Sequence, residues 1–280
     1  MREKHTLSAT LRGHWSLWVH SPRTIIALAF VVMMTTMYTR GQRAIYEEVG
    51  YALHLGEMVF ASVNQGFHLL NTSIGFLVMI SEIPKRISWQ KYALIRQSRG
   101  QWLTSLVVFS AIISALFLAA MLLSAALCSL PYAAPGGGWS DLERLAADPD
   151  YSYEIQFTSE YIRALSPLAA CALAAAVQLG YYMTLTLTVL AFALFDCGNV
   201  GVMICVLLVT SHITLLAELF PGIVLPGLYA TLSNIASQAY GDEIGAALRT
   251  LGGYGAVMAA LIAVMAARVQ HMDLRFEGRE

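Results

Sequence analysis

The chain has 280 residues, of which 57% are hydrophobic and only 12% are charged, and its formal net charge is −1. The mean hydropathy is +0.60. Soluble domains carry about 25% charged residues, so this composition excludes an ordinary soluble protein and fits one that crosses a membrane several times. Because no long polar stretch separates the apolar segments, we expect a single, all-α transmembrane domain that covers residues 1–280.

The first 20 residues are polar and basic, and their tryptophans Trp15 and Trp18 lie on one side of a predicted helix. Basic and aromatic residues in this mixture are typical of a helix that lies in the membrane interface. The first membrane helix is predicted at residues 21–38, because about 20 helical residues cross the hydrocarbon core. The loop 39–51 balances two arginines against two glutamates, and we expect it outside the cell.

Two long apolar segments, 54–80 and 103–130, flank a basic insert at residues 81–102. The insert carries five lysines and arginines against one acidic residue, Glu82. Such an excess of positive charge in a short loop marks the cytoplasmic side of a membrane. Pro84 ends the second membrane helix, and the chain can restart as a short surface helix from Ser88.

The second half of the chain contains three more apolar segments and two polar or broken ones. The predicted fourth, fifth and sixth membrane helices cover residues 165–195, 200–217 and 250–267. The acidic segment 131–164 is expected outside. Residues 218–249 contain two Pro-Gly pairs, and non-helical backbone at membrane depth survives only where protein or a water-filled cavity satisfies it. We therefore predict re-entrant half-helices there rather than a seventh span.

Six crossings with both termini in the cytoplasm distribute the charges consistently. Most lysines and arginines then lie inside, and only five arginines lie outside, which are Arg40, Arg43, Arg144, Arg163 and Arg249. This arrangement follows the positive-inside rule. We expect a multi-pass protein of the plasma membrane.

The second membrane helix carries a stripe of polar side chains. Asn64, His68, Asn71 and Thr72 recur at spacings that place them on one side of a helix, and Glu57 lies nearer its outer end. Polar groups in lipid are costly, so the stripe is expected to face protein or a conduit. Ordinary hydrogen bonds between helices are an equally good interpretation.

Known catalytic motifs do not fit the chain. It has no phosphate-binding Gly-x-x-x-x-Gly-Lys-Ser/Thr sequence and no His-Glu-x-x-His. The pair Glu47-Glu48 is similar to the paired glutamates of intramembrane CAAX-type proteases, but Ala52 replaces the arginine expected four residues later. We expect no enzymatic activity in this chain.

Three stretches stand in a distinctive order along the sequence. The polar second helix runs into Met79-Ile80-Ser81-Glu82-Ile83-Pro84, and Tyr92-Ala93-Leu94-Ile95-Arg96-Gln97-Ser98-Arg99-Gly100-Gln101-Trp102 leads into the long third helix. After a broken apolar segment, the sixth helix ends in Val269-Gln270-His271-Met272-Asp273-Leu274. Over residues 21–274 this order resembles the permease subunits of ABC-2 type exporters.

The resemblance implies a permease that pairs with a second copy or a related permease and works with a cytoplasmic ABC ATPase. The ATPase would bind ATP and Mg, so this chain is expected to hold no cofactor; membrane lipids would surround it, and no nucleic acid is expected as a partner. The insert at 81–102 would be the coupling element that docks on the ATPase. Its candidate contact residues are Pro84, Lys85, Arg86, Trp89, Lys91, Tyr92, Arg96 and Arg99.

The resemblance also assigns roles to the polar and broken segments. The stripe formed by Asn64, His68, Asn71 and Thr72 would line the transport pathway or the dimer interface. The broken segment would be an external gate, with Pro221, Pro226 and Tyr229 as its candidate residues. The cargo stays open among lipid, peptide and drug-like molecules.

Two other functions compete with this one. The chain could be a non-transporting immunity or sensor subunit whose basic loop binds lipid or another partner. It could also be a secondary transporter whose polar groups bind ions, although the sequence lacks inverted-repeat symmetry and a carboxylate near the membrane midplane.

Overall fold

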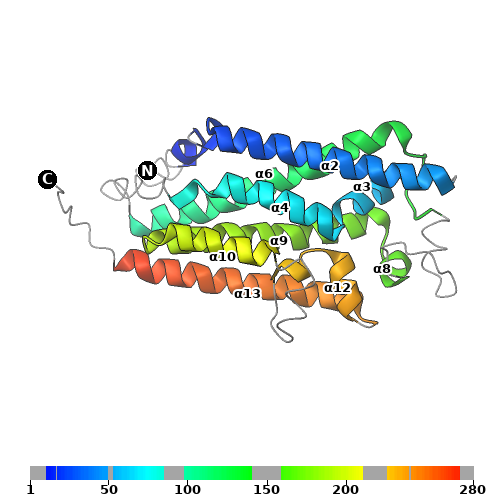
Figure 1. Ribbon diagram of the computed structural model, residues 1–280. Coiled ribbons are helices and arrows are strands. Elements are labelled where there is room, and N and C mark those ends of the chain that lie inside the picture. The colour runs from blue at the N-terminus through cyan, green and yellow to red at the C-terminus, as the bar shows by residue number, and fades with distance from the viewer. Residues whose placement is uncertain are drawn as a thin grey trace, which may run out of the picture.

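The computed structural model describes residues 11–16, 18–49, 53–84, 98–140, 159–210, 226–239 and 241–271. Within these residues the chain is helical, and the one β-type contact is an isolated bridge between His54 and Ala134. The long helices run side by side along one axis (Figure 1). The predicted all-α class is therefore confirmed for the described part of the chain.

The structure divides into helices of very different length. Residues 11–16 and 18–19 are helical and precede the named elements. The described elements are α2 (Pro22–Val49), α3 (Leu55–Val63), α4 (Gly66–Ile80), α6 (Arg99–Ser129), the 3-10 turn η2 (Leu130–Tyr132), α8 (Ser159–Ala164), α9 (Pro167–Leu194), α10 (Gly198–Thr210), η3 (Pro226–Tyr229), α12 (Leu232–Ala239) and α13 (Glu243–Gln270).

Four helical stretches are long and apolar enough to cross a membrane. They are Pro22–Gly41, Arg99–Tyr132, Pro167–Leu194 and Glu243–Gln270. The apolar helices α4 and α10 are shorter. At 1.5 Å per residue, a helix of the length of α10 covers only about 20 Å of a hydrocarbon core about 30 Å thick. These helices indicate a membrane protein, and the count of six crossings stays a prediction.

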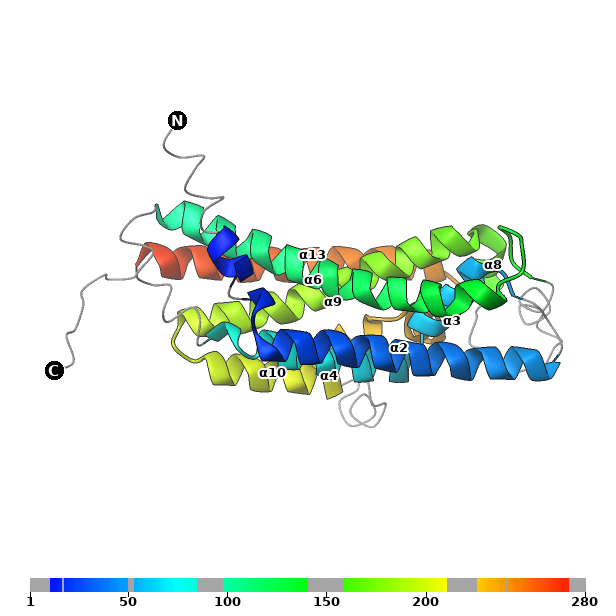
Figure 2. The ribbon, with the colours of Figure 1, turned by 90° about the horizontal axis from the view of Figure 1, so that it is seen from above.

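Helix α9 lies at the centre of the bundle and packs against α13, α10, α6 and α3 (Figure 2). An aromatic cluster joins it to two neighbours: the ring of Tyr182 lies 4.6 Å from Phe76 on α4 and 5.3 Å from Phe117 on α6, centroid to centroid. All three side chains are buried. Edge-on contacts of this kind add to the burial of the rings.

Large apolar side chains also cover the outside of the bundle. Examples are Met37 on α2, Leu127 on α6, Met203 on α10 and Val264 on α13, which are 48–69% exposed when no membrane is considered. Apolar surface of this extent is unusual for a soluble protein. It is the surface expected where helices face lipid.

The two ends of the bundle collect different segments. One end, here named the Pro84 end, holds residues 11–16 and 18–20, the start of α6, the α9–α10 turn and the end of α13 (Figures 1 and 2). Pro84 lies there too, because it contacts Gly198 at the α9–α10 turn. The opposite end, here named the Trp139 end, holds the end of α2, η2, α8 and the start of α13. The described segments that the sequence places in the cytoplasm thus share the Pro84 end.

The first membrane helix is longer than predicted. We expected it to end at residue 38 and to give way to a loop at 39–51, but α2 continues to Val49. Six of the eleven residues 39–49 are arginine, glutamine, alanine or glutamate, which are good helix formers, so polarity alone does not end the helix. The helix is about 42 Å long and exceeds the hydrocarbon core.

The second membrane helix is not continuous. The predicted helix 54–80 is split into α3 and α4 by the pair Asn64-Gln65. Asn64 ends α3, and Gln65 is extended, with ψ of 135°, at the start of α4. Val63, Asn64 and Gly66 are all weak helix formers, which is the physical reason for the break.

The other boundaries agree more closely with the sequence. The third helix, predicted at 103–130, is α6, and the fourth, predicted at 165–195, is α9. The sixth begins earlier than predicted, because α13 starts at Glu243 inside the segment 218–249. The fifth begins at Gly198, and its predicted end at 217 lies outside the described residues.

The helical residues 11–19 pack on α6 through one face. The imidazole of His14 is buried and stacks on Phe109 at 5.2 Å, and its Nε2 lies 3.4 Å from the hydroxyl of Ser105. Trp18 is buried as well, whereas Trp15 is exposed. Their rings nevertheless lie 5.3 Å apart, centroid to centroid, so the two tryptophans share one side of the helix, as predicted.

Acid is expected to release this N-terminal helix from α6. Burial lowers the pKa of His14 from 6.5 to about 4. Protonation therefore favours the released helix, in which the pKa of His14 is higher. The contribution of neutral His14 to the free energy of docking is fully present above pH 6.5 and is lost as the pH falls through 4. Hydrogen exchange in nanodiscs should show lower protection of residues 11–19 at pH 4 than at pH 7. His14→Phe should remove this difference, and an unchanged difference would contradict the assignment.

Candidate functional site

The Pro84 end contains both ends of the basic insert. Among the predicted coupling residues, Pro84 and Arg99 are described, whereas Lys85, Arg86, Trp89, Lys91, Tyr92 and Arg96 lie outside the described residues. The site can therefore be built from the points where the insert leaves α4 and enters α6. Each of these points contacts a helix other than its own.

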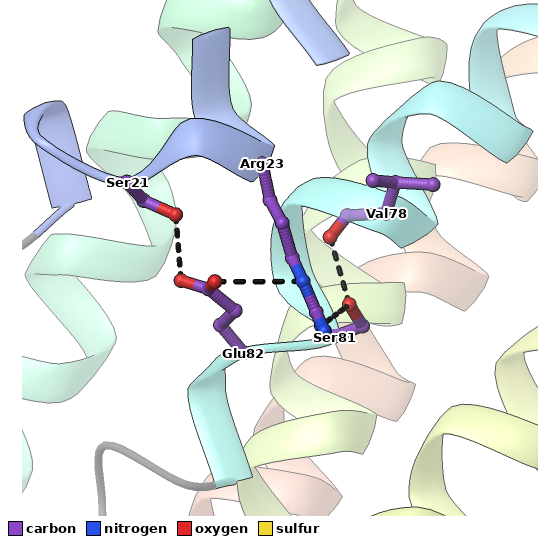
Figure 3. Close-up of polar contacts among 5 residues, drawn as sticks. All are labelled: Ser21, Arg23, Val78, Ser81 and Glu82. Atoms are coloured by element: carbon purple, nitrogen blue, oxygen red, sulfur yellow. Dashed lines mark hydrogen bonds and ion pairs between the residues drawn. The ribbon is translucent and has the colours of Figure 1, made fainter. Parts of the chain in front are cut away.

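The residues that follow α4 are bound to the start of α2 (Figure 3). The hydroxyl of Ser21 donates a hydrogen bond to Glu82 Oε2 at 2.6 Å, and Arg23 Nε lies 3.5 Å from Glu82 Oε1. Arg23 Nη1 donates to Ser81 Oγ at 2.9 Å, and Ser81 Oγ donates to the carbonyl of Val78 at 2.8 Å. Arg23 therefore holds two consecutive residues at the exit of α4.

This polar cluster is partly exposed, which limits its contribution to stability. The side chains of Arg23 and Glu82 are 43% and 23% exposed. Exposed ion pairs contribute about 0–1 kcal/mol, because water screens the charges and ordering the side chains costs entropy. The cluster therefore positions the start of the insert more than it stabilises the bundle.

Pro84 packs directly on the α9–α10 turn. A Cβ atom added to Gly198 would lie 2.3 Å from Cβ of Pro84, so no larger residue fits at Gly198 without movement. The turn itself needs an unusual backbone, since Asp196 has a φ of 61°. Aspartate is one of the few residues other than glycine that adopt this conformation readily.

The other end of the insert contacts the end of α13. Ser98 caps α6, accepting a hydrogen bond from the backbone N–H of Gln101 at 3.3 Å. In the first turn of α6, Arg99 Nη1 donates to the carbonyl of Gln270. On α13, Arg268 Nε donates to the carbonyl of Leu194 at 3.3 Å. The ends of α6, α13 and α9 are thus joined in series.

These contacts connect several helices at the Pro84 end. The exit of α4 is joined to α2 and to the α9–α10 turn, and the entry of α6 is joined to α13. A displacement of the basic insert would therefore act on helices from both halves of the chain. The contacts are hydrogen bonds, one ion pair and the close packing of Pro84 on Gly198.

The polar stripe predicted on the second helix faces other helices. His68 Nε2 lies 3.0 Å from Thr35 Oγ1 on α2, and Thr72 Oγ1 lies 3.2 Å from Tyr182 OH on α9. Asn71 Nδ2 donates to Tyr38 OH at 3.1 Å. These are hydrogen bonds between helices of one chain, which was the alternative interpretation of the stripe. A role of these residues in a pathway stays a prediction.

The predicted external gate is only partly described. Pro221 lies outside the described residues, Pro226 begins η3, and Tyr229 is half-buried against the core. The following helix α12 contacts the break between α3 and α4, because Leu232 donates its N–H to Asn64 Oδ1 at 2.8 Å. The structure thus brings together one residue of the polar stripe and the segment predicted to be the gate.

The sequence did not indicate the role of Glu57. The sequence placed Glu57 only near the outer end of the second helix, and in the structure its side chain is fully buried. Its carboxylate accepts hydrogen bonds from the backbone N–H of His54, at 2.7 Å, and of Ser140. Glu57 thereby fixes the segment after η2 to the start of α3. The His-x-x-Glu spacing is a weak capping signal that could have suggested the first of these bonds.

Comparisons with known proteins leave the family open. No protein-family model matches the chain, and neither a curated protein nor a solved structure matches it. Within the described residues no group of three or more histidines, cysteines, aspartates or glutamates could hold a metal ion. The resemblance to ABC-2 permeases therefore stays a prediction.

We expect Arg23 and Glu82 to be energetically coupled. Arg23→Gln and Glu82→Gln should destabilise the protein by less together than the sum of the single changes, with a coupling free energy of about 0.5–1 kcal/mol. Unfolding titrations in mixed micelles measure it. The control is the more exposed pair Arg249 and Asp242, whose side chains are 68% and 57% exposed and should show almost no coupling. Additive effects at Arg23 and Glu82 would contradict their contact.

A side chain at Gly198 should displace Pro84. Gly198→Ala is expected to lower the free energy of unfolding by about 1–3 kcal/mol, as overpacking of a close contact does. Gly255→Ala is the matched control, since a Cβ atom there meets nothing within 4 Å. Thermal unfolding of both variants in the same detergent gives the comparison. Equal stability of the two variants would show that Pro84 does not depend on Gly198.

Proposed function

We propose that this chain is the membrane-spanning permease subunit of an ATP-driven exporter of the ABC-2 type. A separate cytoplasmic ATPase would drive it, and its cargo would be a lipid, a peptide or a drug-like molecule. The observation that carries the proposal is the attachment of both ends of the basic insert to other helices. Through Glu82 and Pro84 at one end and Arg99 at the other, the insert reaches α2, the α9–α10 turn and α13.

The topology that we propose has six crossings. Four crossings would be the long spans. The fifth would be α3 and α4 together, as one broken crossing, and the sixth would be α10 with the residues that follow it. Both termini would then be cytoplasmic in the plasma membrane, with the Pro84 end inside. The shared position of residues 11–20, the start of α6 and the end of α13 supports this arrangement (Figure 1).

The mechanism that we propose is mechanical. The ATPase would bind ATP and Mg and would hold the insert through its lysines and arginines, Lys85, Arg86, Lys91, Arg96 and Arg99. Closure of the ATPase would move the insert, and the contacts of Glu82, Pro84 and Arg99 would pass that movement to the helices. Pairing with a second permease would complete the conduit. Coupling of this kind requires an element with two states that both partners bias.

A sensor or immunity subunit is the second candidate, and one observation favours it. Of the helical residues 11–16 and 18–19, Arg12, Trp15 and Val19 are exposed. A basic residue beside exposed apolar side chains suits the headgroup region of an anionic membrane. In that case the basic insert would bind lipid rather than an ATPase.

Charge reversal in the insert separates these functions. Lys91→Glu with Arg96→Glu should leave membrane insertion intact and abolish co-purification of an ATPase that carries a phosphate-binding loop. The matched control reverses two exposed arginines at the Trp139 end, Arg40→Glu with Arg163→Glu, and should keep the ATPase. Tagged protein is purified from its native membrane in mild detergent, and mass spectrometry identifies what accompanies it.

The result that contradicts the proposal is equally clear. If the unaltered chain is recovered without an ATPase after crosslinking and in several detergents, the permease assignment is wrong. If the ATPase accompanies the Lys91→Glu, Arg96→Glu variant as well as the unaltered chain, and its activity is stimulated equally, the insert is not the coupling element.

A further inference from the structure

The break between α3 and α4 is held by side chains from two other elements. From α9, Gln178 Nε2 donates to the carbonyl of Val63 at 2.8 Å. From α12, the backbone N–H of Leu232 donates to Asn64 Oδ1 and the hydroxyl of Ser233 donates to the carbonyl of Asn64, both at 2.8 Å. Non-helical backbone within a membrane requires such partners.

Asn64 forms hydrogen bonds both at the end of α3 and at the start of α12. Its own N–H donates to the carbonyl of Phe60 at 3.0 Å and closes the last turn of α3. Its side-chain oxygen meanwhile accepts one of the first N–H groups of α12, which have no partner within that helix. Near the start of α12, the Thr231 hydroxyl accepts a long hydrogen bond from the backbone N–H of Asn234, at 3.4 Å, and one from the Ser233 hydroxyl, at 3.3 Å, but none from the N–H of Leu232. The start of α12 therefore depends on a side chain of another element.

Helix α12 has one buried face and one exposed face. Thr231, Leu232 and Ile235 are at most 1% exposed and Ala236 is 8% exposed, whereas the neighbouring Ser237 is exposed. After the helix, Gly241 has a φ of +90°, a backbone conformation that glycine adopts without strain. Helix α12 is thus a short element, docked by one face and followed by a glycine turn.

We propose that Asn64 is the positioning residue that holds α12 closed over the break between α3 and α4. Release of the Leu232 and Ser233 hydrogen bonds would free α12 to swing away. It would expose Asn64 Oδ1 and the Asn64 carbonyl beside Gln178, whose Oε1 is buried and has no hydrogen-bond partner among the described residues. The break would then present several acceptors to a conduit. Its role in gating transport rests on the proposed function, but the docking of α12 does not.

Cysteine labelling tests the docking directly. Ala236→Cys places a thiol on the buried face, and Ser237→Cys places one on the exposed face as the matched control. A maleimide is added to the purified protein in nanodiscs, and mass spectrometry of peptides separates these thiols from the native cysteines. The thiol at position 236 should react much more slowly than the thiol at position 237.

Removal of the Asn64 amide should open α12. Asn64→Leu is expected to raise the labelling rate at position 236 about tenfold or more, the effect of leaving a buried backbone donor unpaired, and to leave the rate at position 237 unchanged. Asn64→Asp keeps an acceptor next to the start of α12 and should keep the slow rate. An unchanged rate in Asn64→Leu would overturn the proposal, as would equal rates at the two positions in the unaltered chain.

A second measurement separates this proposal from the proposed function. With a co-purified ATPase, a non-hydrolysable ATP analogue should raise the labelling rate at position 236. If Asn64→Leu opens α12 but no ATPase accompanies the chain, the positioning role of Asn64 stands and the permease assignment fails. If the ATPase is present and its nucleotide does not change the labelling, the part of the proposal that assigns gating to α12 is overturned.

Discussion

The break between α3 and α4 imposes the constraint on which the rest of the structure depends. A helix that stops inside a membrane leaves backbone carbonyls and N–H groups that lipid cannot satisfy. Gln178 from the central helix α9 and the start of α12 supply the missing partners at Val63 and Asn64. The hydrogen bonds of Leu232 and Ser233 to Asn64 therefore join α12 to the break, next to the contact that Gln178 of α9 makes with Val63.

The two ends of α4 are held by different kinds of interaction. At the Pro84 end the contacts are partly exposed, such as the Arg23–Glu82 pair, and each is weak. At the break the hydrogen bonds are buried. Removing one partner leaves the other unpaired away from water, and this costs more free energy than the net free energy that the hydrogen bond contributes. The first end can therefore adjust to a partner at little cost in free energy. The second end therefore resists small displacements more strongly than the first.

The sequence predicted long helices better than their interruptions. The end of α6 was predicted because Pro131 breaks the apolar segment, and the start of α9 was predicted at residue 165, where apolar character resumes; in the structure Ser166 caps α9 and Pro167 begins it. The break at Asn64 was missed because hydropathy, averaged over a long apolar segment, does not register two residues. Of the candidate site, the sequence indicated Pro84 and Arg99, but not what they contact. The partners Gly198 and Gln270 are distant in sequence, and only the packing of the bundle brings them together.

Helix α4 connects the break to the Pro84 end. It has 15 residues, or about 22 Å of helix, and it begins at the break and ends next to Glu82. Along its length it packs closely on α2, since a Cβ atom at Gly75 would lie 2.8 Å from the ring of Phe30. A short helix that is held along one side moves as a unit rather than bending. A shift imposed at Glu82 would therefore reach Gln65, where a small displacement is enough to break the hydrogen bonds between Asn64 and α12, because such bonds weaken steeply with distance and angle.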